Sequence, residues 1–139
     1  MTAIVAALII LFLGIGAAFH FYWGFGGRIG WDVAAPQRTD GTRIMDPSPA
    51  ATFAVAIALA LIVALLAASM LNVPMPRIAL RAAFVVLGAV FLARGLSWHP
   101  YFGLFKRVRT TAFARNDTWF YSPGCVLTGF GFLYLAWRG

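Results

Sequence analysis

The sequence predicts an all-α integral membrane protein, an antiparallel four-helix transmembrane bundle that forms one domain over residues 1–139. Residues 1–27 carry no charged side chain. Hydrophobic residues make up 62% of the chain and charged residues 11%, against roughly 25% charged residues in soluble domains. Apolar stretches long enough to cross a bilayer alternate with polar connections. Because a backbone inside lipid must satisfy its own hydrogen bonds, each stretch is expected to be a helix.

The first two spans have clear boundaries. The first is predicted over residues 2–24, where a run of glycines ends it. We expect it to be a retained span, because it lacks the basic start of a signal peptide. The second is predicted over residues 50–71, after the stretch Asp46-Pro47-Ser48-Pro49, which supplies a capping side chain and a proline for the first helical position. Alanines at four-residue spacing predict a close packing face on this helix.

The third span is predicted over residues 77–96, directly after a tight proline-containing turn. The fourth is predicted over residues 118–137, with Ser122 as a candidate cap and Pro123 near its first turn. Between them, residues 97–119 combine basic and aromatic side chains. Their apolar positions share one helical face, which predicts an amphipathic segment in the headgroup layer.

Charge predicts the orientation of the bundle. The net charge is +7, from eleven Lys and Arg against four Asp and no Glu. In a soluble protein this would indicate nucleic acid; beside membrane spans it indicates lipid headgroups and topology, so no nucleic-acid partner is expected. Eight basic residues fall in or beside the two long connections and three at the other end. The positive-inside rule therefore predicts cytoplasmic long connections and external termini.

The helical arrangement gathers the chemically versatile side chains at the long-connection end, in a predicted polar pocket at the bilayer edge. An ionisable residue at membrane depth is a candidate for function. The predicted ligand-binding residues are His20, Trp23, Arg94, His99, Arg107, Arg115, Asp117 and Tyr121.

Four interpretations of this pocket remain open. In the structural one, Asp117 pairs with Arg94 or Arg115 and holds the connections together. In the second, the arginines and aromatic residues bind a lipid phosphate or another anion. In the third, which the residue pattern disfavours, His20 and His99 bind a metal or haem. In the fourth, His20 and Asp117 form a catalytic acid–base pair. No cofactor is expected, since no carboxylate cluster completes a metal shell and one cysteine cannot form a cysteine-based site.

Several motifs resemble a known family. They are the stretch from His20 to Gly27, the stretch from Phe113 to Thr118 and the Tyr121-Ser122-Pro123 triplet, with Arg94 and Phe105-Lys106-Arg107 also similar. Together they resemble the small bacterial four-helix membrane proteins of the domain-of-unknown-function 3995 family. The family pattern continues with Leu-Cys after the Ser-Pro pair, where this chain has Gly124-Cys125. The resemblance implies four spans and a location in the bacterial cytoplasmic (inner) membrane. It implies no activity.

These observations favour a small non-catalytic membrane protein. We expect an accessory or scaffold subunit that binds a larger membrane protein complex, itself or an anionic lipid through its basic, aromatic cytoplasmic-edge face. The alternative is a small membrane enzyme that acts on a lipid or isoprenoid-type substrate. In that case His20 and Asp117 would exchange protons, and Arg94 would hold a phosphate.

Overall fold

The structure is a computed structural model that describes residues 2–138, and over these residues it is all-helical with no β-strand. Its long helices are α1 (Thr2–Gly24), α3 (Pro49–Met70), α4 (Arg77–Gly95) and α6 (Ser122–Arg138). Short helical segments are α2 (Trp31–Ala34), α5 (Ala112–Asn116) and the π-helical turn η1 (Asp117–Tyr121). Helices α1, α3 and α4 are each long and apolar enough to cross a membrane. The prediction of an all-α chain with helices long and apolar enough to span a membrane is thus confirmed.

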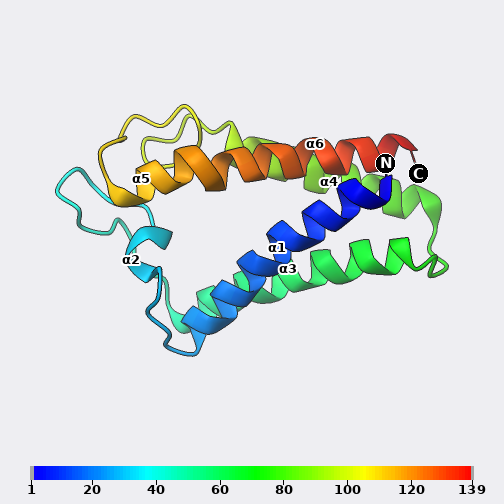
Figure 1. Cartoon of the computed structure of the whole chain (residues 1–139), viewed down its shortest axis with the longest axis horizontal. Helices are drawn as coiled ribbons and strands as arrows, with labels where there is room; N and C mark the ends of the chain where they lie inside the picture. Colours follow the sequence, from blue (N-terminus) through cyan, green and yellow to red (C-terminus); the bar gives the residue numbers. More distant parts are fainter. Residues whose placement is uncertain (1, 139) are drawn as a thin grey trace.

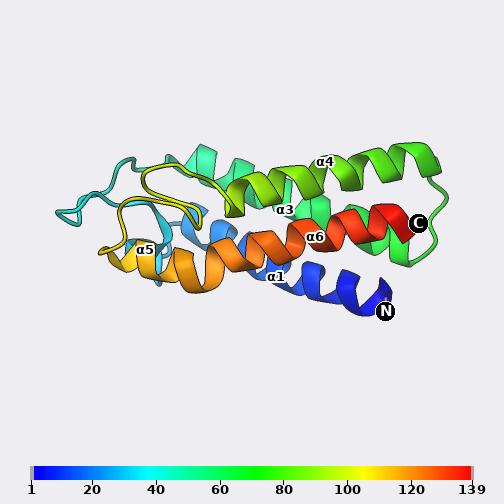
Figure 2. The same cartoon turned by 90° about the horizontal axis from the view of Figure 1, so that it is seen from above.

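The long helices form two packed pairs. Helix α1 lies along α3, and α4 lies along α6, while the first half of α1 also contacts α6 (Figure 1). The view from above shows the same pairing (Figure 2). Where the pairs meet, the buried core includes Ile9, Leu13, Leu66, Phe84 and Phe132. The interior is therefore a single apolar layer between the two pairs.

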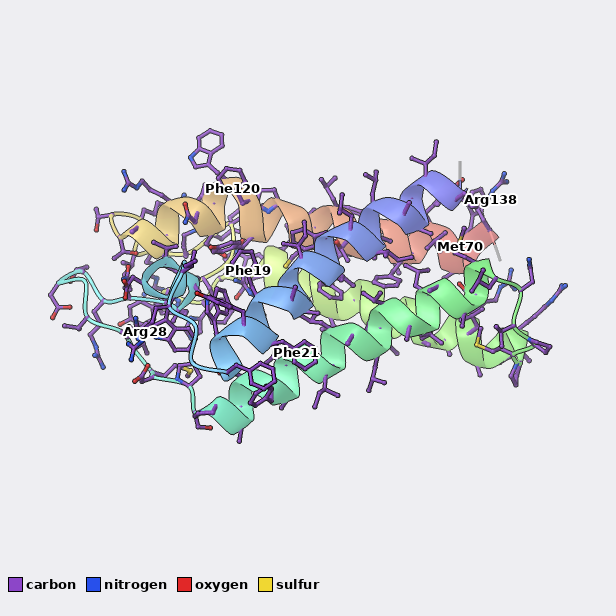
Figure 3. All side chains as sticks on the ribbon, turned by 60° about the horizontal axis from the view of Figure 1, so that its bottom comes forward. Phe19, Phe21, Arg28, Met70, Phe120 and Arg138 are labelled. Carbon is purple, nitrogen blue, oxygen red and sulfur yellow. The ribbon has the colours of Figure 1, made fainter. Side chains whose placement is uncertain are left out.

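The chain places its polar connections at opposite ends of the long axis. The two long connections, with α2 and α5, lie at one end, and both termini lie with the α3–α4 turn at the other (Figure 1). Figure 3 shows Arg28 at the long-connection end and Met70 and Arg138 at the terminal end. We call the end with the two long connections the connection end, and the end with both termini the terminal end.

Helix α3 begins with a capping side chain and a proline, as the sequence indicated. The Ser48 side chain accepts a hydrogen bond from the Ala51 amide at 3.2 Å, and Pro49 begins α3. Serine is favoured at this position because its oxygen satisfies an amide that the first helical turn leaves free. Proline is tolerated directly after it because its missing amide would have no helical partner there.

The start of the last helix differs from the prediction. Helix continues without a break from Ala112 through η1 into α6, and Thr111 is its cap, accepting from the Ala114 amide at 3.1 Å. Ser122 is buried inside this helix, so its predicted role as a cap is wrong. Pro123 lies two residues after Tyr121, the last residue of the π-helical turn. Proline has no amide to donate and crowds the preceding turn, and a widened turn before it accommodates both effects.

The segment between α4 and α5 is also not the helix that its apolar spacing suggested. Residues 97–111 are irregular and fold back on the end of α4, where the Leu104 amide donates to the Gly95 carbonyl at 2.8 Å and the Phe105 amide to the Ser97 carbonyl at 3.3 Å. The helical spacing of its apolar residues did not produce a helix, because tertiary hydrogen bonds and the burial of Lys106 outweigh the weak helical preference of this segment.

Glycines bring α4 and α6 together. A Cβ atom on Gly129 would lie 2.9 Å from the Gly88 carbonyl oxygen and 2.7 Å from Leu92 Cγ. One on Gly95 would lie 2.9 Å from the Ser122 carbonyl oxygen. Small residues allow helix backbones in lipid to approach this closely, which increases dispersion contacts. This close approach holds the end of α4 against the start of α6, where the candidate site forms.

Candidate functional site

The candidate site is a buried ion cluster at the connection end, centred on the carboxylate of Asp117. Arg94, in the last turn of α4, donates from Nη2 to Asp117 Oδ1 at 2.8 Å. Lys106, in the irregular segment, donates from Nζ to Asp117 Oδ2 at 3.0 Å. The Asp117–Arg94 pair is one of the two pairings that the sequence predicted. The cluster therefore joins a helix end, a folded-back segment and the start of the last helix.

The remaining hydrogen-bonding capacity of the cluster is largely satisfied by neighbouring groups. Asp117 Oδ2 also accepts from the Gly103 amide at 2.9 Å. Lys106 Nζ donates to the Gly103 carbonyl at 3.1 Å and to Thr118 Oγ1 at 2.7 Å. Gly103 has a φ of +92°, and a Cβ there would collide with the Ser97 carbonyl, so this position requires glycine. The irregular segment is thus shaped around the ions.

Burial makes this arrangement energetically important. The side chains of Lys106 and Asp117 are both 0% exposed, while that of Arg94 is 33% exposed and its guanidinium lies 4.9 Å from the centre of the Phe102 ring. A buried charge is tolerated only when it is paired and hydrogen-bonded. Asp117 precedes the predicted fourth span, and burial raises its pKa, but the hydrogen bonds and charges of Arg94 and Lys106 outweigh this and hold the pKa below its ordinary value of 3.8. The carboxylate is therefore ionised at neutral pH.

This shift predicts acid sensitivity. Because the pKa of Asp117 is lower in the folded than in the unfolded protein, its contribution to stability is present above about pH 4 and is lost as the pH falls through the folded value. We expect the free energy of unfolding in an uncharged detergent to fall between pH 4 and pH 2. The control variant Asp40→Asn removes an exposed carboxylate in a loop. Its free energy of unfolding should fall between pH 4 and pH 2 by nearly as much as that of the wild-type chain. Stability that stays constant down to pH 2 would contradict the assignment.

His20 and Trp23 belong to a separate arrangement on α1. His20 Nδ1 lies 2.7 Å from the Gly16 carbonyl oxygen, and its ring meets Trp23 edge-on at 5.2 Å. Trp23 donates to the Ile29 carbonyl at 2.8 Å and packs edge-on against Trp31 at 5.8 Å. Among the hydrogen bonds and ion pairs of residues 2–138, none joins His20 to Asp117. The hydrogen bond to Gly16 fits a structural role for His20.

The first long connection continues this arrangement. Arg43 lies 5.2 Å from the centre of the Trp31 ring and forms ion pairs with Asp32 at 2.7 Å and Asp46 at 3.1 Å. These contacts tie the connection to the end of α1 through Trp23. They were not predicted from the sequence, because residues far apart along an irregular segment show no spacing pattern.

The other predicted residues have no hydrogen bond or ion pair to the cluster within residues 2–138. His99 is exposed and stacks on Phe102 at 4.1 Å, so Phe102 separates it from Arg94. Tyr121 donates from its hydroxyl to the Val33 carbonyl at 3.4 Å, which links η1 to α2. Arg107 and Arg115 are exposed. Of the predicted set, the structure brings Arg94 into contact with Asp117 and His20 into contact with Trp23.

Sequence reasoning missed the central cation. Lys106 is the one lysine among eleven basic residues, and it falls in the segment that was predicted to lie in the headgroup layer. Its choice over arginine is the only signal in the sequence, since a lysine ammonium is compact enough for a closed pocket. No group of three or more His, Cys, Asp or Glu side chains within residues 2–138 has the arrangement of a metal site.

Fold and site together define a class of protein: an all-helical chain with helices long and apolar enough to cross a membrane, and with a buried ion cluster that joins the second long connection to the helices on either side of it. The chain belongs to the family described as "Protein of unknown function (DUF3995)", which it matches over residues 2–132. The comparisons found no match among curated proteins or solved structures. The resemblance predicted from the sequence motifs is thus confirmed.

Proposed function

We propose that the chain forms an antiparallel four-helix bundle across the bacterial cytoplasmic membrane, with α6 as its fourth span. Helices α1, α3 and α4 have the length and composition of spans. Helix α6 packs along α4, carries no charged residue between Asp117 and Arg138, and has Trp119 and Trp137 near its two ends. Tryptophan is enriched at both membrane interfaces. The excess of basic residues at the connection end supports a cytoplasmic position for that end.

We propose further that the protein is a non-catalytic accessory or scaffold subunit. One observation carries this proposal: the best acid–base candidate, Asp117, has both carboxylate oxygens bonded inside a closed cluster. A general acid or base must reach a proton on the substrate, whereas this carboxylate is 0% exposed and already paired with two cations. The cluster therefore suits a structural lock that shapes the connection end for binding.

The binding surface in this proposal is the basic–aromatic surface, which combines exposed aromatic and cationic side chains at the connection end. Trp98 and Trp119 are 76% and 74% exposed, and Trp98 stacks on Phe105 at 5.5 Å. Tryptophan and arginine are enriched where proteins bind one another, because they bury much area and also donate hydrogen bonds. The members of this surface are Trp98, Phe105, Arg107, Arg109, Arg115, Trp119 and Phe120.

We propose that the partner that binds this surface is a membrane protein. The alternative result of the test is that only anionic lipid is bound. Purification of the native protein in mild detergent should retain a partner at constant stoichiometry, identified by intact mass spectrometry. Trp119→Ala combined with Arg115→Gln should reduce the retained partner about tenfold or more, as expected where a central aromatic side chain and a cation are removed together.

Trp137→Ala is the matched control, because Trp137 is also 74% exposed but lies next to Arg138, at the terminal end (Figure 3). It should retain the partner at the wild-type level. Elution of the wild-type chain alone, or with lipid only, would overturn the subunit proposal. Equal loss in both tryptophan variants would show that the basic–aromatic surface is not the binding site.

A further inference from the structure

The turn that joins α1 to α2 displays apolar side chains on the surface. We call residues 25–30, with the sequence Phe-Gly-Gly-Arg-Ile-Gly, the glycine turn. Phe25 is 82% exposed and Ile29 is 72% exposed, and Arg28 between them is exposed as well. The glycine turn shares no residue with the ion cluster or with the basic–aromatic surface, so neither of them accounts for these exposed side chains.

Several contacts fix the shape of the glycine turn. Trp23 donates from Nε1 to the Ile29 carbonyl at 2.8 Å, and the Ile29 amide donates to the Tyr22 hydroxyl at 3.4 Å. Gly26 has a φ of +92°, which side chains rarely adopt, and a Cβ on Gly27 would collide with the Tyr22 ring. Side chains at the end of α1 thus hold the backbone of the turn, and the outward position of Ile29 follows from that backbone.

The glycine turn lies at the level where one helix ends and another begins. Helix α1 ends at Gly24, directly before Phe25, and α3 begins at Pro49. The Phe25 ring packs edge-on against Phe53, near the start of α3, with 5.0 Å between the ring centres. Figure 1 shows the end of α1 beside the start of α3. Because both helices are spans in the proposed bundle, this level is the boundary between the hydrocarbon core and the headgroups.

Arg28 places a cation between the two apolar side chains. Within residues 2–138, no carboxylate forms an ion pair with this arginine. The boundary layer of a bilayer has the same mixed character, because acyl chains meet phosphate groups there. Lipid surrounds the spans at this level, and a protein partner would have to displace it. An aromatic ring, an aliphatic side chain and an arginine on one exposed turn therefore fit phospholipid.

We propose that the glycine turn is a membrane-insertion element and that its partner is the phospholipid bilayer. Phe25 and Ile29 lie among the first carbons of the acyl chains, and Arg28 binds lipid phosphate. Arginine is well suited to phosphate because its planar guanidinium donates two parallel hydrogen bonds. The inference rests on the proposed spans, because the turn reaches lipid only if α1 and α3 cross the bilayer. It does not depend on the subunit proposal.

The test measures the immersion depth of nitroxide labels by electron paramagnetic resonance, with the full chain in vesicles of phosphatidylethanolamine and phosphatidylglycerol. Each label is attached to a single introduced cysteine, after the buried native thiol is removed by Cys125→Ala. Labels at Phe25→Cys and Ile29→Cys should be relaxed more by oxygen, which concentrates in hydrocarbon, than by a water-soluble nickel chelate. Their depth should be about 5–10 Å below the headgroup surface, as for apolar side chains of interfacial elements. The label at Arg28→Cys should lie closer to water than both.

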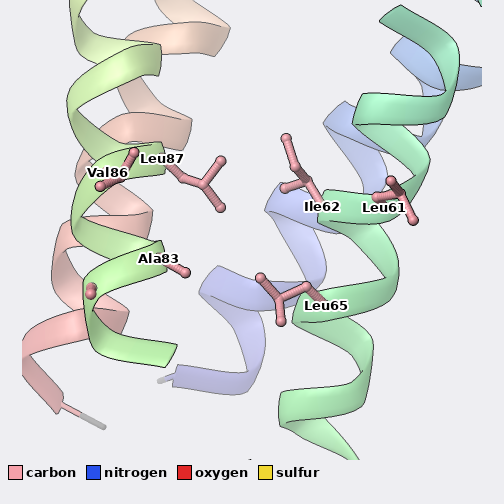
Figure 4. Close-up of a pocket in the computed structure, with 7 residues that line it drawn as sticks. Leu61, Ile62, Leu65, Ala83, Val86 and Leu87 are labelled. Atoms are coloured by element: carbon pink, nitrogen blue, oxygen red, sulfur yellow. The ribbon is translucent and has the colours of Figure 1, made fainter. Parts of the chain in front are cut away.

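Two control positions calibrate the depth. Leu61 is 65% exposed in the middle of α3, where it lines an apolar groove between α3 and α4 (Figure 4). A label at Leu61→Cys should be the deepest, because this position lies at the centre of a proposed span. Thr39 is exposed in the hairpin closed by Gln37 and Arg43, in the same long connection as the glycine turn. A label at Thr39→Cys should be in water.

The controls separate failure of this inference from failure of the proposed spans. A label at Leu61→Cys that is in water would overturn the spans and the inference together. If that label is in hydrocarbon while the label at Ile29→Cys is as exposed to the nickel chelate as the label at Thr39→Cys, membrane insertion of the glycine turn alone is overturned. A label at Ile29→Cys that neither oxygen nor the nickel chelate reaches would show that protein covers the turn, which also overturns the inference.

Discussion

Asp117→Asn is expected to lower the free energy of unfolding by about 3–5 kcal/mol, the range observed when one member of a buried ion pair is removed. The variant leaves the ammonium of Lys106 in a fully buried pocket without its counter-charge. It also replaces one of the two accepting oxygens by an amide NH2, so the side chain can no longer accept from both Arg94 and Lys106. Unfolding by SDS in mixed micelles, followed by circular dichroism, measures the change.

The matched control for this prediction is Asp40→Asn. Asp40 is an exposed carboxylate that bonds within its own turn to Thr42, so its replacement should leave unfolding nearly unchanged. A second variant tests the mechanism. Adding Lys106→Met to Asp117→Asn removes the buried positive charge and should recover part of the lost stability, because an apolar side chain needs no counter-ion. If the double variant is no more stable than Asp117→Asn alone, the destabilisation does not come from an uncompensated Lys106.

The membrane-spanning helices were predictable from the sequence because lipid imposes a strong and local rule. Any stretch that crosses hydrocarbon must be apolar and helical for about 20 residues. Composition alone therefore identifies three such stretches, at residues 2–24, 50–71 and 77–96. The observed α1, α3 and α4 agree with these ranges to within one residue at each end. The cap and proline at the start of α3 are equally local signals.

The candidate site was predictable only in part. Arg94 and Asp117 stood out because both lie at the edges of apolar stretches, where a charge requires an explanation. The burial of Lys106 could not be predicted, because it depends on how an irregular segment folds back on α4. No periodic pattern in the sequence encodes such a fold. The same reason explains why the π-helical turn before Pro123 was missed: the sequence contains a proline, but only the packing of α6 on α4 decides whether the helix stops or widens.

Helix packing is a further point where sequence spacing was an incomplete guide. The alanines at positions 56, 60, 64 and 68 of α3 were expected to form a close packing face, yet only Ala56 among them is fully buried. A close backbone approach that the sequence did not predict lies between α4 and α6, at glycines. The spacing of the alanines predicts a packing face on the helix but not what packs against it, because a stripe of small residues can face either another helix of the chain or lipid. The structure supplies that partner.

Gly129→Ala is expected to destabilise the protein by about 1–3 kcal/mol, the usual cost of overpacking. The added methyl would lie 2.9 Å from two backbone atoms of α4, the Gly88 oxygen and the Leu92 nitrogen, so the helices must separate. Gly14→Ala is the matched control, because a Cβ there has no neighbour within 4 Å. Alanine is the better helix former by about 0.5–1 kcal/mol, so the control should be neutral or stabilising.

The same substitution should also disturb the ion cluster. Gly129 holds α4 against α6, and Arg94 reaches Asp117 across this contact. If the helices separate, the Arg94–Asp117 hydrogen bond lengthens, so part of the cost of Gly129→Ala comes from the cluster. A double-mutant cycle with Arg94→Gln measures this share, because coupled residues give non-additive changes in the free energy of unfolding. We expect a coupling of about 0.5 kcal/mol or more. Additive changes would show that the helix contact and the cluster stabilise the protein independently.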